Sequence, residues 1–457
     1  MTDNIASSAD GIVVERDNIV IDGAGYTLEG TGELPYKGIY LYGRINVTVQ
    51  NIQIKNFWHG VKLSSSNYNN ISGNIIANND YGISLYGSSN NSIVGNYITA
   101  NNVYGIWLEY SSNNNAISEN NVTANNKFGI FLYSSSNNSI SGNTISANNW
   151  YGIRVEESSN NTVSGNTFID DGLFVWDSYH NVVEDNTVNG KPLVYLEDVA
   201  NYTVDDAGQV IVVNCTDIRV ENLNLSNTTV GVQLWKTTST IISGNNITKN
   251  IGGILLIESS NNTISRNDIT NNIEGIGLDC SSNNIIYGNN IINNDYGIWL
   301  EYPSNNNSIY HNNFVDNTNQ IYNYISVNVW DDGYPSGGNY WSDYTDVDYY
   351  SGPFQNETGS DGIWDHPYVI DKNNVDRYPL VRPWGEQFPT EFRLKVPHQA
   401  QDSSNWCGPT SLAMVLRYYG YPIHSWDITE DLGLSNDEGV DLGPGKPFQK
   451  NLYDYVK

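Results

Sequence analysis

One phrase recurs along most of this chain of 457 residues. It opens with Gly-Ile-x-Leu, continues through Ser-Ser-Asn-Asn to an isoleucine, and ends with Asn-x-Ile, as in Gly82 to Ile98. A unit this short cannot enclose a core alone, so successive units must stack in a solenoid. The opening glycines lie 20 to 24 residues apart at Gly38, Gly60, Gly82, Gly105, Gly129, Gly152 and Gly172, and 22 apart at Gly231, Gly253, Gly275 and Gly297.

Three apolar columns run through the repeat, and their spacing indicates strands. Ile83 and Leu85 alternate with other residues at period two, and Ile93 and Ile98 represent the second and third columns. Mostly β-branched residues, separated by Asn and Gly, favour short strands with a turn at each corner. We therefore predict an all-β fold over residues 1–326, a right-handed parallel β-helix of about 14 coils.

Asparagines recur once per coil near the third column. Asn tolerates the left-handed conformation of a tight corner, and stacked amides can form a hydrogen-bonded ladder between coils. We expect both features at Asn74, Asn96, Asn120, Asn143, Asn166, Asn186, Asn245, Asn267, Asn289 and Asn312. Residues 191–227 lack the phrase but remain rich in alternating Val, Ile and Leu, which predicts one or two irregular coils.

Charge and composition restrict the partners. The chain has 50 acidic and 21 basic residues, a net charge of -29, which disfavours nucleic acid and anionic membranes. Its three cysteines form no disulfide framework, and no apolar run is long enough to span a membrane. We expect a monomer at the cell surface or outside the cell, although no signal peptide is visible at the N-terminus.

The outward positions of the Gly-Ile-x-Leu strands predict a carbohydrate-binding face. Aromatic side chains lie there beside carboxylates, at Trp107, Glu109, Phe131, Tyr133, Glu156, Asp279, Trp299 and Glu301. Two such carboxylates on nearby coils could also serve as the acid and base of a polysaccharide-degrading enzyme. The bland alternative is a solvated face whose rings brace neighbouring coils. The scattered histidines and two methionines predict no metal site, and copper in particular is not expected.

Residues 327–390 differ in composition from the repeat. They are aromatic and acidic, as in Trp341-Ser-Asp-Tyr and Ser360-Asp-Gly, and they follow the last regular coil. An uncovered solenoid end exposes unpaired backbone, so we predict a cap and linker here. No cofactor is expected, although this density of Asp and Asn oxygens could hold calcium.

Residues 391–457 form a third segment. Apolar residues after Cys407 follow helical spacing, so Cys407 is predicted at a helix N-terminus, where the dipole favours a thiolate. Gln401 lies six residues earlier and could donate to an oxyanion. Only His424 follows Cys407, just past the predicted helix, so no residue is placed to act as the base.

Two resemblances follow from these motifs. The stacked phrase, Gly190-Lys-Pro-Leu-Val-Tyr-Leu-Glu, Gly338-Asn-Tyr-Trp-Ser-Asp-Tyr and Asn374-Val-Asp-Arg-Tyr-Pro-Leu resemble NosD-type β-helix proteins over residues 5–385. That resemblance implies an exported or surface protein, and the family name derives from a periplasmic factor of copper-site maturation. The Gln401 and Cys407 motif resembles the start of papain-like double-glycine (bacteriocin-processing) cysteine peptidases.

The peptidase resemblance implies Cys407 as nucleophile and Gln401 as oxyanion donor in an α+β module. The family's later His and Asp have no counterpart in this chain, which implies an incomplete and inactive module. The leading interpretation is therefore a surface scaffold that binds a glycan. The first alternative is a double-glycine-type peptidase, if the chain continues downstream, and the second is a polysaccharide-degrading enzyme.

Overall fold

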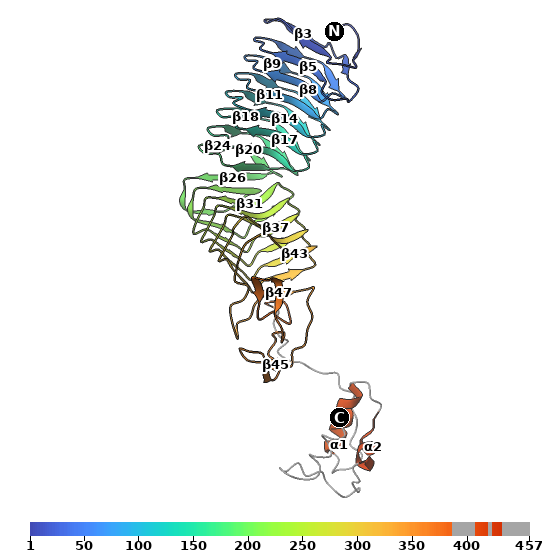
Figure 1. Cartoon of the computed structure of the whole chain (residues 1–457), viewed down its shortest axis with the longest axis vertical. Coiled ribbons are helices and arrows are strands. Elements are labelled where there is room, and N and C mark those ends of the chain that lie inside the picture. Colours follow the sequence, from blue (N-terminus) through green and yellow to red (C-terminus); the bar gives the residue numbers. More distant parts are fainter. Residues whose placement is uncertain (386–406, 419–422, 432–457) are drawn as a thin grey trace. The chain divides into compact units, whose positions relative to one another are not determined.

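The computed structural model describes residues 1–385, 407–418 and 423–431. The chain divides into two compact units, Met1–Glu386 and Gln387–Lys457. The first unit is a right-handed parallel β-helix of about 14 coils, which confirms the predicted fold class (Figure 1). The described part of the second unit consists of the helices α1 (Cys407–Tyr418) and α2 (Ser425–Asp431). The predicted strands of that module lie outside the described residues.

The coils form two stacks. The first stack, residues 5–188, contributes the first strands of a long 16-stranded sheet: β1 (Ile5–Ala6), β4 (Thr27–Glu29), β7 (Gln53–Lys55), β10 (Ile75–Ala77), β13 (Tyr97–Thr99), β16 (Asn121–Thr123), β19 (Thr144–Ser146), β22 (Thr167–Ile169) and β25 (Thr187–Val188). Its Gly-Ile-x-Leu strands form a separate sheet, here called the broad sheet: β2 (Ile12–Val14), β5 (Lys37–Tyr42), β8 (His59–Ser64), β11 (Tyr81–Tyr86), β14 (Tyr104–Glu109), β17 (Phe128–Tyr133), β20 (Tyr151–Glu156) and β23 (Leu173–Trp176). The third sheet contains β3 (Val20–Asp22), β6 (Thr48–Gln50), β9 (Asn70–Ser72), β12 (Ser92–Val94), β15 (Ala116–Ser118), β18 (Ser139–Ser141), β21 (Thr162–Ser164) and β24 (Val182–Glu184).

The second stack, residues 191–341, continues the long sheet with its own Gly-Ile-x-Leu strands. These are β26 (Lys191–Glu197), β28 (Gln209–Val213), β31 (Val230–Trp235), β34 (Gly252–Ile257), β37 (Glu274–Asp279), β40 (Tyr296–Glu301) and β43 (Asn319–Asn323). One six-stranded sheet contains β27 (Ala200–Val204), β29 (Thr216–Glu221), β32 (Ile241–Ser243), β35 (Thr263–Ser265), β38 (Ile285–Tyr287) and β41 (Ser308–Tyr310). The other contains β30 (Asn224–Ser226), β33 (Asn246–Thr248), β36 (Asp268–Thr270), β39 (Asn290–Ile292), β42 (Asn313–Val315) and β44 (Tyr340–Trp341).

The core consists of the predicted apolar columns. Ile83, Leu85, Ile93 and Ile98 are fully buried, and each lies in register with an aliphatic residue of the next coil. The opening glycine is required by close packing between coils. A Cβ atom on Gly105 would lie 2.6 Å from the carbonyl oxygen of Gly129. A side chain at this position would therefore force adjacent coils apart.

The predicted asparagine ladder is present. The backbone N–H and the side-chain amide of Asn96 both donate to Oδ1 of Asn120, at 3.0 and 2.9 Å. The same amide also donates to the Ile71 carbonyl of the preceding coil. The prediction that these asparagines are left-handed was wrong, because the preceding residue has the positive φ, as at Gly95 and Glu119. The buried amides are thereby left to link coils.

An antiparallel turn joins the two stacks; we call this region the joint. Asn189 and Gly190 both have positive φ and connect β25 to β26, which pair antiparallel. This combination is the two-residue type I′ hairpin loop that Asn-Gly favours. Residues 191–227 form the strands β26 to β30, so the predicted irregular coils are present. The turn was not predicted, and it moves the Gly-Ile-x-Leu strands from the broad sheet into the long sheet.

Two buried glutamines pair the free edge of the broad sheet at the joint. Gln209 accepts a hydrogen bond from the Leu173 N–H at 2.9 Å and donates to the Leu173 carbonyl at 2.7 Å. Gln233 makes the same pair of contacts with Val175. These amides replace the missing next strand, because a buried backbone group without a partner is costly.

The far end of the second stack is covered by residues 327–385. Trp341 is buried and stacks on Phe314 of the last coil at 4.4 Å and on Tyr368 at 4.2 Å. This segment also contains two short antiparallel hairpins, β45 (Tyr350–Ser351) with β46 (Glu357–Thr358), and β47 (Tyr368–Asp371) with β48 (Asn374–Asp376). Asn374 and Asp376 accept the last rungs of two ladders from the backbone N–H groups of Asn328 and Asn339.

Candidate functional site

The outer side of the broad sheet carries a continuous row of aromatic rings. Tyr81 stacks on Trp107 at 5.1 Å, and Tyr151 stacks on Phe174 at 4.8 Å. The intervening rings contact one another from strand to strand, so each ring is partly shielded by its neighbours. We call this surface the aromatic face; it consists of Tyr81, Tyr104, Trp107, Phe128, Phe131, Tyr151 and Phe174.

The predicted carboxylates of this face are bound by cations. Glu109 accepts an ion-paired hydrogen bond from Lys62 at 3.2 Å, two strands away. Burial raises the pKa of Glu109, and burial also lowers the pKa of Lys62, while their mutual attraction opposes both shifts. Glu156 pairs with Arg154 at 2.7 Å, and that guanidinium lies 5.2 Å from the Phe174 ring centre. These pairs fix the face and leave neither carboxylate as a free acid or base.

The remaining predicted residues are distributed over two sheets. Phe131 is only 8% exposed, and Tyr133 lies half-buried on the same strand of the broad sheet. Asp279, Trp299 and Glu301 lie instead on β37 and β40 of the long sheet, beyond the joint. The structure therefore does not bring the eight predicted residues together as one continuous column.

Within the second stack, Asp279 and Glu301 lie in register on adjacent strands. Burial and the charge of Glu301 raise the pKa of Asp279, while Cys280 opposes the shift. Glu274, on the same strand as Asp279, has its pKa raised to about 7 by burial, with Glu301 adding to the shift. Trp299 stacks on Tyr322 at 4.1 Å.

A cleft of about 360 Å³ lies at the joint, between turns of the two stacks. We call it the joint cleft. Trp150 from the first stack and Ile273 from the second line it and are 53% and 47% exposed. Thr229 lines it too, with a buried hydroxyl that has no hydrogen-bond partner. Sequence reasoning missed this cleft because its walls come from coils that are far apart in the chain.

Asp171 in the joint cleft is the end of a ladder. Its Oδ2 accepts from both the backbone and the side-chain amide of Asn148 at 2.9 Å. Burial raises the pKa of Asp171 to about 7, and the Asn148 hydrogen bonds oppose that shift. The signal in the sequence was an acid where the preceding coils place asparagine.

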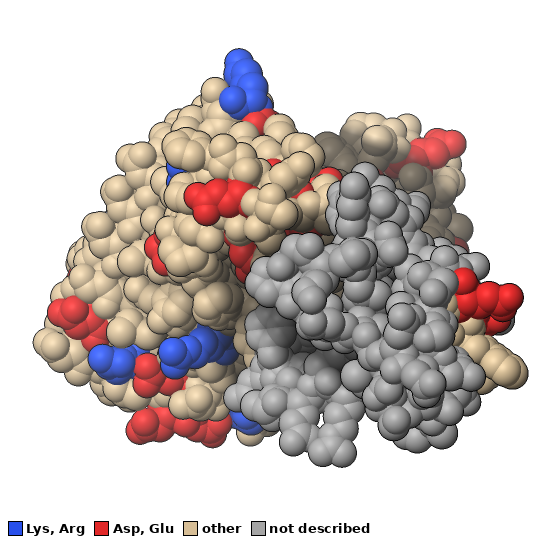
Figure 2. Space-filling model, turned by 90° about the horizontal axis from the view of Figure 1, so that it is seen from below, with Lys and Arg blue, Asp and Glu red and all other residues tan. Residues whose placement is uncertain are grey.

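The carboxylates of the cap accept hydrogen bonds from the protein. Asp348 accepts from the Ser360 hydroxyl and from the backbone of Asp361 and Gly362. Asp346 pairs with His366 at 2.7 Å. The calcium site considered from composition stays a prediction. On the face drawn in Figure 2, acidic and basic side chains are interspersed on a surface that is mostly uncharged.

In the second unit, α1 begins at Cys407, which confirms the predicted position at a helix N-terminus. Gln401 and the side chain of Cys407 lie outside the described residues. No helix among the described residues has the length and apolar character needed to cross a bilayer.

Known solved structures share the fold class at low identity. The A-module of the mannuronan C-5 epimerase AlgE6 from Azotobacter vinelandii is 14% identical, with 71% of this chain and 86% of that chain covered and a TM-score of 0.32. DFA-IIIase from Arthrobacter chlorophenolicus A6 in complex with GF2 is 18% identical, with 56% and 68% covered and a TM-score of 0.29. No curated protein matches the chain.

Family models match both units. The model described as Peptidase_C39 like family matches residues 393–456. The model described as periplasmic copper-binding protein (NosD) matches residues 3–172 and 169–346, most of the β-helix. These matches agree with both resemblances drawn from the sequence, and the chain belongs to the NosD family.

Proposed function

We propose that this protein is an exported scaffold that binds a neutral carbohydrate polymer along the aromatic face and in the joint cleft. The observation that supports this most is the unbroken row of rings on consecutive strands, β11 to β23, of the broad sheet. Aromatic rings offer an apolar surface to a sugar ring, and polar groups beside them can bind its hydroxyls.

The joint cleft supplies the polar complement. Asn149, Lys249 and Asn271 line it together with the exposed ring of Trp150. The unpaired hydroxyl of Thr229 adds a donor and an acceptor that no protein group uses. A net charge of -29 disfavours a polyanionic ligand, which is why a neutral polymer is proposed. The periplasmic family description supports export.

The test is binding of the full chain to an array of neutral polysaccharides, followed by titration with the best ligand. Trp107→Ala and Trp150→Ala are each expected to weaken binding about tenfold, or about 1.4 kcal/mol. Tyr324→Ala is the matched control, because Tyr324 is a 66% exposed aromatic residue at the far end of the second stack. Absence of any polysaccharide ligand, or an equal loss in the control, would contradict the proposal.

A second candidate function is cysteine peptidase activity in the second unit. It is favoured by the Peptidase_C39-like match and by the start of α1 at Cys407. The test is alkylation by iodoacetamide at pH 7, with Cys280 as an internal control. Cys280 is exposed, and burial together with Asp279 raises its pKa. Faster alkylation of Cys407 than of Cys280 would support an activated thiol, and slower alkylation would leave the module without a nucleophile.

A further inference from the structure

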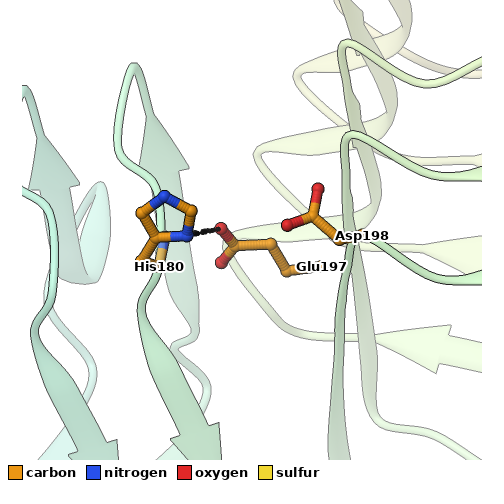
Figure 3. A group of neighbouring side chains, drawn as sticks. All are labelled: His180, Glu197 and Asp198. Atoms are coloured by element: carbon orange, nitrogen blue, oxygen red, sulfur yellow. Dashed lines mark hydrogen bonds and ion pairs between the residues drawn. The ribbon is translucent and has the colours of Figure 1, made fainter.

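Three potential metal ligands meet at the joint, on the opposite side of two stacks that are separate in the sequence (Figure 3). His180 lies in the turn between β23 and β24, at the end of the first stack. Glu197 ends β26 and Asp198 follows it, at the start of the second stack. Their ligand atoms all lie within 4.8 Å of one another.

The two carboxylates are held in place by neighbouring groups. Oε2 of Glu197 accepts from the Tyr195 hydroxyl at 2.7 Å and from the backbone N–H of Asn181 at 3.2 Å. Oδ1 of Asp198 accepts from the side-chain amide of Asn214 at 2.6 Å. Hydrogen bonds of this kind orient metal ligands and are important for affinity. Two of the three ligands are therefore already fixed.

The third ligand can adjust. Glu197 has a side chain that is 10% exposed, whereas that of His180 is 72% exposed and can rotate. Nδ1 of His180 lies 3.7 Å from Oε1 of Glu197, which is too long for a hydrogen bond. Two ligands on one tetrahedral ion lie roughly 3.3 Å apart, because each bond is about 2.0 Å long. A small rotation of the imidazole would thus close the group around an ion.

The charge of the group also favours a cation. Within the described parts of the chain, no Lys or Arg forms an ion pair with Glu197 or Asp198, and the pairing recorded for Glu197 is with His180. One imidazole nitrogen with two carboxylate oxygens suits zinc better than calcium, which prefers oxygen ligands alone. The group contains no sulfur, so it does not fit the soft donor set of Cu(I) that the family description suggests.

We propose that His180, Glu197 and Asp198 form a binding site for a divalent cation of the zinc class that links the two stacks across the joint. The ion binds one ligand from the last coil of the first stack and two from the first coil of the second. Water occupies its remaining positions on the solvent side. The site is independent of carbohydrate binding, because neither the aromatic face nor the joint cleft contributes to it.

The test is titration of the metal-free full chain with Zn²⁺ by calorimetry, with the thermal midpoint measured in parallel. Bound Zn²⁺ is expected to raise the midpoint, because the ligands converge only in the folded chain. His180→Ala and Asp198→Asn are each expected to weaken Zn²⁺ binding by at least about tenfold and to remove the rise. Glu197 is left unchanged because it also ends a ladder at Asn181.

His366→Ala is the matched control. His366 is exposed and pairs with Asp346, but that pair belongs to no group of three donors among the described residues. The loss caused by His180→Ala is the deciding quantity, because other residues of the chain can also take up zinc. An unchanged Zn²⁺ isotherm in His180→Ala, an equal loss in His366→Ala, or preferential binding of Ca²⁺ at this site would overturn the proposal.

Discussion

At the scale of single residues, Asp171 shows how one atom type changes the repeat. Four preceding coils place Asn79, Asn101, Asn125 and Asn148 at this ladder position, and each accepts from the rung before it. An asparagine also needs an acceptor for its own amide, as Asn148 finds in the Val122 carbonyl. A carboxylate cannot donate there, and burial raises its pKa from 3.8 to about 7.

Asp171→Asn is expected to stabilise the protein above pH 7. The raised pKa means that the folded state binds the proton more tightly than the unfolded state between about pH 4 and pH 7. The free energy of unfolding therefore falls as pH rises through this window, and the cost persists above it. The variant should show a shallower decrease of the thermal midpoint with pH and a higher midpoint at pH 8.

Asp170→Asn is the control for that experiment, because it removes the same charge from an exposed neighbour in the cleft. Asp376 and Glu274 also have pKa values raised to about 7 by burial, so part of the pH dependence will remain. Equal pH profiles for Asp171→Asn and the wild type would show that the carboxyl is not protonated in the fold.

At the scale of strands and coils, two adjacent glycines of β34 test the packing argument. A Cβ atom on Gly253 would lie 2.4 Å from the carbonyl oxygen of Gly275, a backbone atom of the next coil. On Gly252 the nearest atom would be a Val230 methyl at 3.4 Å. Gly253→Ala should therefore lower the free energy of unfolding by about 1–3 kcal/mol, whereas Gly252→Ala should be nearly neutral. Urea denaturation of both variants measures this, and similar losses would refute the distinction.

The strands themselves could be predicted from the sequence because each carries its own local signal. Ile83, Ile93 and Ile98 lie where the period placed them, and all are fully buried. The left-handed corner was placed one residue too late, since both Gly95 and Asn96 are compatible with a turn. Only the amide contacts of Asn96 in the folded chain distinguish the two positions.

The joint was not predicted because the same phrase stands on both sides of it. The phrase specifies which residues face inward but not which strand of the next stack it pairs with. Asn189-Gly190 was the available signal for a hairpin. The contacts that complete the joint, from Gln209 and Gln233 to β23, span 36 and 58 residues. The same reason hid the His180 group and the joint cleft.

At the scale of the whole first unit, stability should depend on neighbouring coils only. The buried apolar residues form two clusters, one mostly in each stack, and Trp235 of the second stack packs with the first cluster. In such a solenoid each coil contacts its neighbours, so damage at one end is expected to stay there. The two ends can therefore be tested separately.

Trp341→Ala provides that test at the capped end. The change removes the stacking on Phe314 and Tyr368 and leaves the buried Asp376 without the indole N–H that donates to it at 2.9 Å. We expect a local loss of about 3–5 kcal/mol. Amide hydrogen exchange should accelerate in β39 and β42 and remain unchanged in β11 to β17. Trp150→Ala, which removes an exposed ring, should leave exchange at the capped end unaltered. Equal acceleration in both stacks of Trp341→Ala would mean that the β-helix unfolds as one cooperative body rather than from its ends.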